Sequence, residues 1–309
     1  MRVALLAGGT GGAKLAAGMQ EEVGGDLAVI ANTGDDIEAL GVHVSPDPDL
    51  ITYWLDDEID AEQGWGIRGD ISTVFERLVR LGAPDWFRLT NLDLATCLRR
   101  RQLLDEGARP TEAQARIAAG LGVVARVLPM SDEPVRTRVR TPAGWRGFQE
   151  YLIVDRAEPP IEEVEFAGVD DAAPTPEVLA AIESAEAIVI GPSNPVISIG
   201  PILAVPGMRD AIAASGAPVV AVSPFVAGRA IKGPTERFMT AAGRDPSAAG
   251  VAETYGELLD GIVVDSSDPD PPPERPPSLA VPTLMDDAAD RRRVAEQTLE
   301  FAASLGRDT

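Results

Sequence analysis

Four carboxylates lie close together early in the chain and could bind a divalent cation. Asp35 and Asp36 end the polar segment 32–36, and a second acidic segment, with Asp47 and Asp49, follows a short way on. Carboxylate oxygens are the hard ligands that Mg²⁺ prefers, and Mg²⁺ usually takes one or two of them together with substrate phosphates. Because Asp also commonly closes turns and caps helices, the spacing leaves two interpretations open, a magnesium site and ordinary turn chemistry.

A glycine-rich stretch at residues 8–14 joins an apolar run to a helix-forming segment and could bind phosphate. Small residues let backbone N–H groups approach an anion, and a helix N-terminus adds favourable potential. The stretch is neither a P-loop, because Leu15 stands where Ser or Thr would bind magnesium, nor a dinucleotide fingerprint. A tight turn that needs glycine is the alternative. The candidate phosphate-binding residues are Gly9, Thr10, Gly11, Gly12 and Lys14.

Two loops in the second half of the chain carry further donors for an anion. Ser193 and Asn194 follow an apolar run and offer hydroxyl and amide groups to a phosphate or a nucleobase edge. Arg229 and Lys232 lie in residues 228–234, a stretch bounded by glycine and proline. The alternatives are a rigid proline turn for the first loop and a solvated charged loop for the second.

Charge and the rarity of two residue types exclude several classes of function. The 309 residues include 49 acidic and 27 basic side chains, which gives a net charge of −22 and disfavours a nucleic-acid binder, since such proteins carry clustered Lys and Arg. One histidine, His43, and one cysteine, Cys97, cannot build a structural zinc site. No Gly-x-Ser-x-Gly motif marks a hydrolase nucleophile.

The same composition indicates the cellular setting. A single thiol cannot form an internal disulfide, which fits a reducing cytoplasm. The start of the chain is interrupted by glycines and predicts a buried strand instead of a signal peptide. No apolar stretch approaches the ~18 residues that span a bilayer. We therefore expect a cytoplasmic protein with no membrane segment.

The apolar runs predict an α/β fold with a Rossmann-like parallel sheet as its core. Residues 2–7, 27–31, 187–190 and 218–222 are short apolar runs, and each leads into a glycine-rich or polar loop. Strands whose C-terminal ends carry such loops are typical of parallel sheets that bind ligands at that edge.

A helical insertion and a β-hairpin region are expected to interrupt this core. The chain is predicted to be a single domain, with core residues 1–45 and 175–309 and an inserted region 46–174. Within the insertion, 50–81 and 93–121 show helical spacing, whereas 135–154 alternates at period two around a turn and predicts the hairpin. Towards the end of the chain, the sequence predicts a Pro- and Asp-rich loop at 266–278 and an amphipathic helix at 287–305.

Nine short segments are spread along almost the whole chain. Each segment alone is weak evidence for a family, but their order along the chain is specific. They are residues 8–14, 32–36, 45–49, 64–66, 129–134, 148–150, 191–195, 198–202 and 223–224. In this order they resemble the 2-phospho-L-lactate transferase family (CofD/FbiA) of coenzyme F-420 biosynthesis.

The resemblance implies a Rossmann-like core, usually a homodimer, and a magnesium-dependent transfer. A guanylylated 2-phospholactate, or its enolpyruvyl counterpart, would donate its phospho-acid to the terminal hydroxyl of the deazaflavin Fo and release GMP. Phosphoryl transfer needs mainly positioning, a cation and donors around the phosphate oxygens. Two glycine-containing loops and a carboxylate cluster supply groups of that kind.

The resemblance also implies roles for particular residues. Asp35 and Asp49 would bind Mg²⁺ and carry the catalysis, while Asp36 and Asp47 would orient them or act through water. The nucleotide diphosphate would lie across residues 9–12 and the Ser193–Asn194 loop. Lys232 or Arg229 would close over it.

One segment departs from the family. Relatives have Gly-Asp-Arg-Asp followed shortly by Ala-Thr-His, whereas Leu92 and Cys97 stand here in place of the arginine and histidine. Asp93 and Thr96 remain and are the expected acceptor-binding residues. An arginine contact cannot be kept by leucine, so the acceptor pocket is remodelled or the chain takes another acceptor.

The sequence leaves two further functional classes open. One is a nucleotide- or sugar-nucleotide-binding regulator that shares the glycine stretch without this reaction. The other is an NAD-dependent dehydrogenase, for which the glycine spacing is wrong, although Asp35 and Asp36 offer an acidic partner for a ribose.

Overall fold

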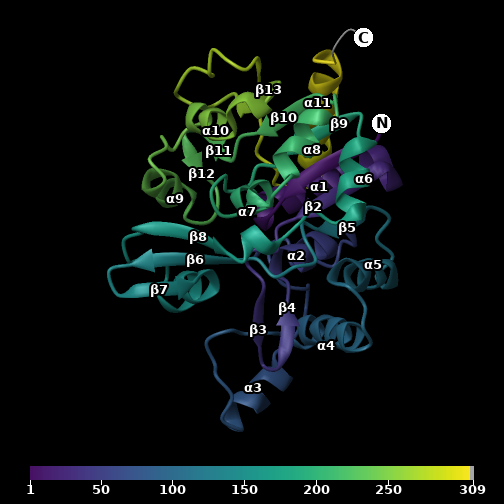
Figure 1. Cartoon of the computed structure of the whole chain (residues 1–309), viewed down its shortest axis with the longest axis vertical. Coiled ribbons are helices and arrows are strands. Elements are labelled where there is room, and N and C mark those ends of the chain that lie inside the picture. Colours follow the sequence, from purple (N-terminus) through teal and green to yellow (C-terminus); the bar gives the residue numbers. More distant parts are fainter. Residues whose placement is uncertain (307–309) are drawn as a thin grey trace.

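A computed structural model describes residues 1–306, and its centre is a seven-stranded sheet (Figure 1). The strand order is β14-β13-β10-β9-β1-β2-β5, and each neighbouring pair is parallel. The strands are β1 (Val3–Ala7), β2 (Leu27–Ala31), β5 (Arg126–Pro129), β9 (Ala187–Ile190), β10 (Val219–Val222), β13 (Gly261–Asp265) and β14 (Ser278–Val281). The predicted α/β, Rossmann-like class is confirmed.

Helices cover both faces of this sheet, because successive residues of its strands point to opposite sides. Val3 and Leu5 of β1 belong to a core shared with α1 (Gly9–Val23), α2 (Pro46–Leu55) and α11 (Ala288–Ser304). Ala4 and Leu6 face the other layer. That layer consists of α6 (Pro176–Glu183), α7 (Ile199–Ala204), α8 (Met208–Ala214) and α10 (Ala248–Tyr255). The central strands β1, β2, β9 and β10 are therefore apolar throughout, as expected for a doubly covered parallel sheet.

Two smaller regions extend from the core (Figure 1). The lower one contains the hairpin β3 (Ile37–Ala39) and β4 (Val42–Val44) with α3 (Thr73–Arg80), α4 (Asn91–Asp105) and α5 (Pro110–Gly120). The other is an antiparallel sheet of β7 (Gly144–Gly147), β6 (Arg136–Thr141) and β8 (Glu163–Ala167). Helices α2 to α5 and the hairpin of β6 and β7 fall in the segments predicted as helical and as a hairpin. Two parts of these predictions are wrong, because residues 56–72 are irregular and Glu150–Val154 is a helical turn instead of a strand. Strands β3, β4 and β8 were not predicted.

The predicted boundaries of the insertion differ from the observed regions. Helix α2 falls inside the range 46–174 but packs on the central sheet, and β3 and β4 fall inside the range 1–45 but belong to the lower region. Strand β5 falls inside the range 46–174, yet it pairs with β2 and forms an edge of the central sheet. A core strand therefore separates the helical region from the hairpin region. The final helix α11 and the irregular course of residues 266–277 agree with the sequence. Within residues 1–306, none of the helices has the length and apolar character needed to cross a membrane.

The glycine-rich stretch forms the first turn of α1 instead of a separate loop. A Cβ on Gly11 would overlap the carbonyl oxygen of Pro192, and one on Gly12 would lie 2.8 Å from the Cβ of Ala7. These glycines let the start of α1 pack directly against β1 and the loop after β9. The N-terminus of α1 is thereby fixed at the carboxyl edge of the sheet.

Candidate functional site

A cavity of about 420 Å³, here called the central cavity, opens at the carboxyl edge of the sheet. The N-terminus of α1 and the loops after β2, β9 and β10 line it. Of the residues expected to bind a ligand, those in the lining are Gly9, Thr10, Gly11, Lys14, Asp35, Ser193, Asn194 and Lys232. The structure thus brings together most of the polar groups that the sequence suggested.

Anion-binding groups gather at one end of the central cavity. The first turn of α1 presents backbone N–H groups without helical partners, and the helix dipole favours an anion there. Across from it, the side-chain nitrogen Nδ2 of Asn194 is buried and has no hydrogen-bond partner among the described residues. Its Oδ1 accepts from the N–H of Val196 at 2.9 Å, which fixes the amide so that Nδ2 is the free donor. This end suits phosphate oxygens.

Asp47 and Asp35 are the carboxylates in the lining of this cavity. Asp47 accepts from the N–H of Gly9 at 2.8 Å and from Nδ2 of Asn32 at 2.9 Å. Burial raises the pKa of Asp47 to about 6. Burial, followed by the negative charge of Asp47, raises the pKa of Asp35 well above its usual range.

The pair fits a divalent cation. Oδ1 of Asp35 is buried without a hydrogen-bond partner within residues 1–306, and a second carboxylate destabilises its charge. A cation would satisfy that oxygen and offset the repulsion. The described residues contain no group of three or more His, Cys, Asp or Glu side chains arranged for a metal. Two carboxylates completed by ligand phosphates are the usual donor set for Mg²⁺.

Asp49 lies outside this arrangement, which corrects its expected role. Its carboxylate forms a buried ion pair with Arg100 of α4, with Nη1 donating to Oδ2 at 3.0 Å and Nη2 donating to Oδ1. Asp47 and Asp49 are two positions apart on α2 and so point to opposite sides of the helix. In the described structure, Asp47 faces the central cavity and Asp49 faces α4.

Asp36 also points away from the central cavity. It accepts from Ser45 Oγ at 2.8 Å and lies 3.0 Å from Nε2 of His43. Burial opposes the charge of His43, but its hydrogen bonds to Asp36 and Glu38 raise its pKa. Asp36 and His43 line a separate, smaller cavity of about 260 Å³. Asp36 therefore does not orient a metal ligand in the central cavity.

Both lysines of the chain lie at the central cavity. Lys14 donates to the carbonyl of Met285 at 2.6 Å, and its ammonium lies 5.8 Å from the ring centre of Trp54. Burial, with smaller contributions from neighbouring cations including Lys232, lowers the pKa of Lys14. Lys232 donates to the carbonyl of Gln63 at 2.7 Å. These cations come from α1 and from the loop before α9 (Thr235–Ala241).

The expected acceptor residues Asp93 and Thr96 are absent from the described lining of the central cavity. Asp93 accepts from Thr90 Oγ1 at 2.6 Å and caps the start of α4. Cys97 is buried in an apolar cluster, and Leu92 is half exposed. The departure from the family pattern is therefore confined to α4. Gly12 is likewise buried in packing, outside the described lining.

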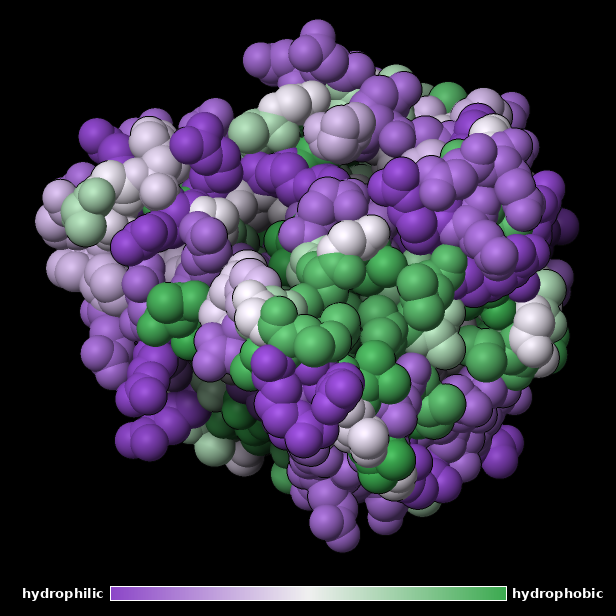
Figure 2. All heavy atoms as spheres, turned by 90° about the horizontal axis from the view of Figure 1, so that it is seen from below, coloured by the Kyte–Doolittle hydropathy of each residue, from purple (hydrophilic) through white to green (hydrophobic). Residues whose placement is uncertain are grey.

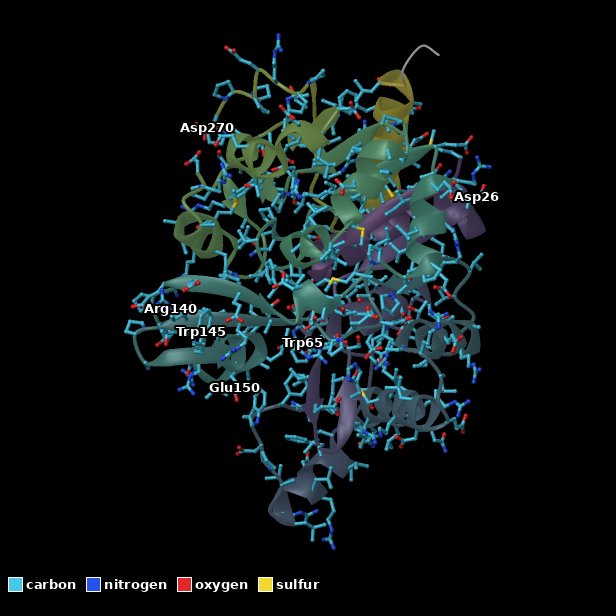
Figure 3. All side chains as sticks on the ribbon, in the orientation of Figure 1. Asp26, Trp65, Arg140, Trp145, Glu150 and Asp270 are labelled. Carbon is cyan, nitrogen blue, oxygen red and sulfur yellow. The ribbon has the colours of Figure 1, made fainter. Side chains whose placement is uncertain are left out.

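The cavity also has an apolar wall, which the sequence did not predict residue by residue. It includes Trp65, Phe148, Leu152 and Ile231. Trp65 is 57% exposed, and in Figure 3 it lies nearer the middle of the view than Trp145 of the hairpin. Residues 64–66 and 148–150 were among the segments that carry the family resemblance, and this was the available signal.

The family model for the 2-phospho-L-lactate transferase CofD matches residues 3–298. The chain belongs to the CofD family. It is 39% identical over 265 residues to the 2-phospho-L-lactate transferase of Methanosarcina mazei, covering 85% of this chain and 87% of that protein. It is 41% identical over 316 residues to the phosphoenolpyruvate transferase of Streptomyces griseus, covering 99% of both. This CofD-family chain is therefore an enzyme of the transferase class, which argues against the regulator and the dehydrogenase.

A solved structure confirms the fold of this CofD-family chain. A UPF0052-family protein of Bacillus halodurans aligns with a TM-score of 0.63 at 18% identity, covering 96% of this chain and 98% of that one. At this level of identity the likeness establishes the architecture alone.

Proposed function

We propose that the enzyme transfers a 2-phospholactyl or phosphoenolpyruvyl group from a guanosine diphosphate-linked donor to the hydroxyl of the deazaflavin Fo, with release of GMP. The observation that carries this proposal is the central cavity itself. It combines an anion-binding helix N-terminus, two buried carboxylates and an apolar wall around one space of about 420 Å³. The names of the relatives support a phospho-acid as the transferred group, either 2-phospholactate or phosphoenolpyruvate. The cavity offers groups suited to each part of the reaction.

The phosphates of the donor would lie at the polar end. The N–H groups of Thr10 and Gly11, the free Nδ2 of Asn194 and the ammonium of Lys14 belong to residues that line the cavity, and they would bind these phosphates. Charge-assisted hydrogen bonds to oxyanions are among the stronger polar contacts in proteins. Binding at this end leaves the phospho-acid beside the two carboxylates.

Asp35 and Asp47 would hold Mg²⁺ with the donor phosphates, and the cation would neutralise charge that develops during transfer. The oxygen of the acceptor hydroxyl forms a bond to the phosphorus of the phospho-acid. The bond from that phosphorus to the bridging oxygen breaks, and GMP leaves with that oxygen. The proton of the hydroxyl would pass to a carboxylate oxygen of Asp35 or Asp47 that the cation leaves unbound.

The acceptor would bind along the apolar wall. Trp65, Phe148 and Leu152 offer flat apolar surface to a planar tricyclic ring. The altered residues Leu92 and Cys97 lie outside the described lining, so they leave this wall unchanged. Retention of the deazaflavin acceptor is therefore favoured over a different acceptor.

The experiment is a direct assay of the purified chain. Fo, Mg²⁺ and each guanylylated phospho-acid are mixed, and mass spectrometry detects GMP and the phosphodiester product. We expect product with at least one donor and none after chelation with EDTA. Asp47→Asn should abolish turnover. Binding of Fo without product from any donor would contradict the proposed reaction.

We also propose that the enzyme is a homodimer that pairs through its lower face. Figure 2 shows hydrophobic residues gathered in one continuous area on this face. Val74 of α3 and Leu81, which directly follows that helix, are 42% and 71% exposed, and Ile71 before the helix is 59% exposed. Exposed apolar patches of this kind commonly mark protein interfaces. Light scattering should give twice the chain mass, and Leu81→Glu should give monomers. A monomeric wild-type protein would contradict the proposal.

A further inference from the structure

A short flap between α2 and α3 reaches the central cavity. Residues 58–68 fold back on themselves, with Arg68 N–H donating to Glu58 O at 2.8 Å and Asp60 N–H donating to Gly66 O at 3.0 Å. Ile59 and Ile67 pair across its base and are buried. The flap is thus anchored in the core at one end, while its tip is held by its own hydrogen bonds.

The tip of the flap is tied to two other elements that line the cavity, α1 and the loop before α9. Lys232 Nζ donates to the carbonyl of Gln63 at 2.7 Å, and Thr10 Oγ1 donates to the next carbonyl, that of Gly64, at 3.1 Å. Lys232 and Thr10 themselves line the cavity, as does Trp65 at the tip. These two hydrogen bonds therefore join the flap to residues that line the ligand space.

We propose that the flap is a gate across the central cavity, and that Lys232 and Thr10 are positioning residues that hold it closed through the carbonyls of Gln63 and Gly64. Closing places the Trp65 ring on the cavity, and opening breaks both hydrogen bonds and widens the path for a nucleotide. This inference rests on the proposed function only where it names the nucleotide.

Gly64 provides a selective way to disturb the gate. Its φ is +75°, and a Cβ there would overlap Nζ of Lys232. Because that atom is the end of a flexible side chain, Gly64→Ala displaces the ammonium and keeps its charge. Gly66 has nearly the same φ, +74°, but a Cβ there meets no described atom within 4 Å. Gly66→Ala therefore carries the same backbone strain and serves as the matched control.

The first test uses the ligand-free protein. Hydrogen–deuterium exchange of the backbone amides in residues 58–68 is compared for the wild type, Gly64→Ala, Gly66→Ala and Lys232→Met. A hydrogen bond to a charged group is lost in Gly64→Ala and in Lys232→Met, so we expect exchange about tenfold faster in both than in Gly66→Ala. Equal exchange rates in Gly64→Ala and Gly66→Ala would show that the hydrogen bond from Lys232 does not hold the flap closed.

The second test asks whether the flap controls passage. Release of a fluorescent GDP analogue is followed by stopped flow, and we expect it to be about tenfold faster in Gly64→Ala than in Gly66→Ala. Faster exchange with unchanged release would overturn the gate. If the analogue does not bind the wild type, the proposed function fails. The exchange experiment still decides whether the hydrogen bond from Lys232 holds the flap closed.

Discussion

Asp49→Asn separates two roles for this carboxylate, that of a metal ligand and that of an ion-pair partner for Arg100. In the structure both oxygens of Asp49 accept from the Arg100 guanidinium, and the residues are 6% and 3% exposed. Nη2 of Arg100 also donates to Gln114 at 3.2 Å, so the guanidinium connects α2, α4 and α5. The substitution leaves a buried cation without its counter-charge.

The size of the effect follows from that burial. Breaking one side of a buried ion pair costs about 3–5 kcal/mol, and we expect the lower end because Asn keeps one acceptor oxygen. At an unfolding entropy of about 2.1 cal/mol/K per residue for 309 residues, a loss of about 3 kcal/mol lowers Tm by about 5 °C. Replacing both partners with apolar residues, Asp49→Leu with Arg100→Met, should recover much of this loss.

Calorimetry at pH 7.5 measures Tm, and the transfer assay at 25 °C measures the activity of the folded protein. Asp49→Asn should melt about 5 °C lower and keep measurable turnover at 25 °C. Asp47→Asn, two residues away on the same helix, should lose turnover without losing stability. An Asp49→Asn variant with unchanged Tm and no turnover would refute the structural role assigned to Asp49.

Two further predictions concern the cavity and its supports. Because burial raises the pKa of Asp47 to about 6, its charged form destabilises the ligand-free protein above that pH, and Asp47→Asn should stabilise it by about 1–3 kcal/mol at pH 7.5. Melting curves should show this gain shrinking as the pH falls through about 6, since wild-type Asp47 is then protonated; an equal gain at pH 5 would contradict the assignment. Gly11→Ala should cost about 3 kcal/mol or more in urea denaturation, because its Cβ overlaps a backbone carbonyl of Pro192. Gly120→Ala, an exposed helical site with open space, should gain up to about 1 kcal/mol, and similar results for both glycines would disprove the packing argument.

The central strands could be predicted because each is a compact apolar run closed by a turn. Strand β5 could not, since Arg126 and Pro129 enclose only Val127 and Leu128. Its place in the sheet depends on pairing with β2, a contact about one hundred residues away along the chain. Strand β8 was missed for a related reason. Its glutamates pair with arginines of β6, and that partnership exists only after folding.

The candidate site was predictable to the extent that parallel strands end at one edge of their sheet. That rule brings the loops containing Asp35 and Ser193 to the N-terminus of α1. It does not specify which face of α2 meets the cavity. Asp47 and Asp49 are equivalent in sequence spacing, and the choice between them is made by Arg100, which lies 51 positions further along the chain.

An enzyme with a net charge of −22 must still hold a polyanionic donor if the proposed reaction is correct. Its only two lysines, Lys14 and Lys232, both lie at the central cavity, where the N-terminus of α1 adds positive potential. The buried Asp35 and Asp47 oppose that potential until a divalent cation binds. Cation and donor should therefore bind cooperatively, because each removes the charge that disfavours the other in a buried space where solvent screens little.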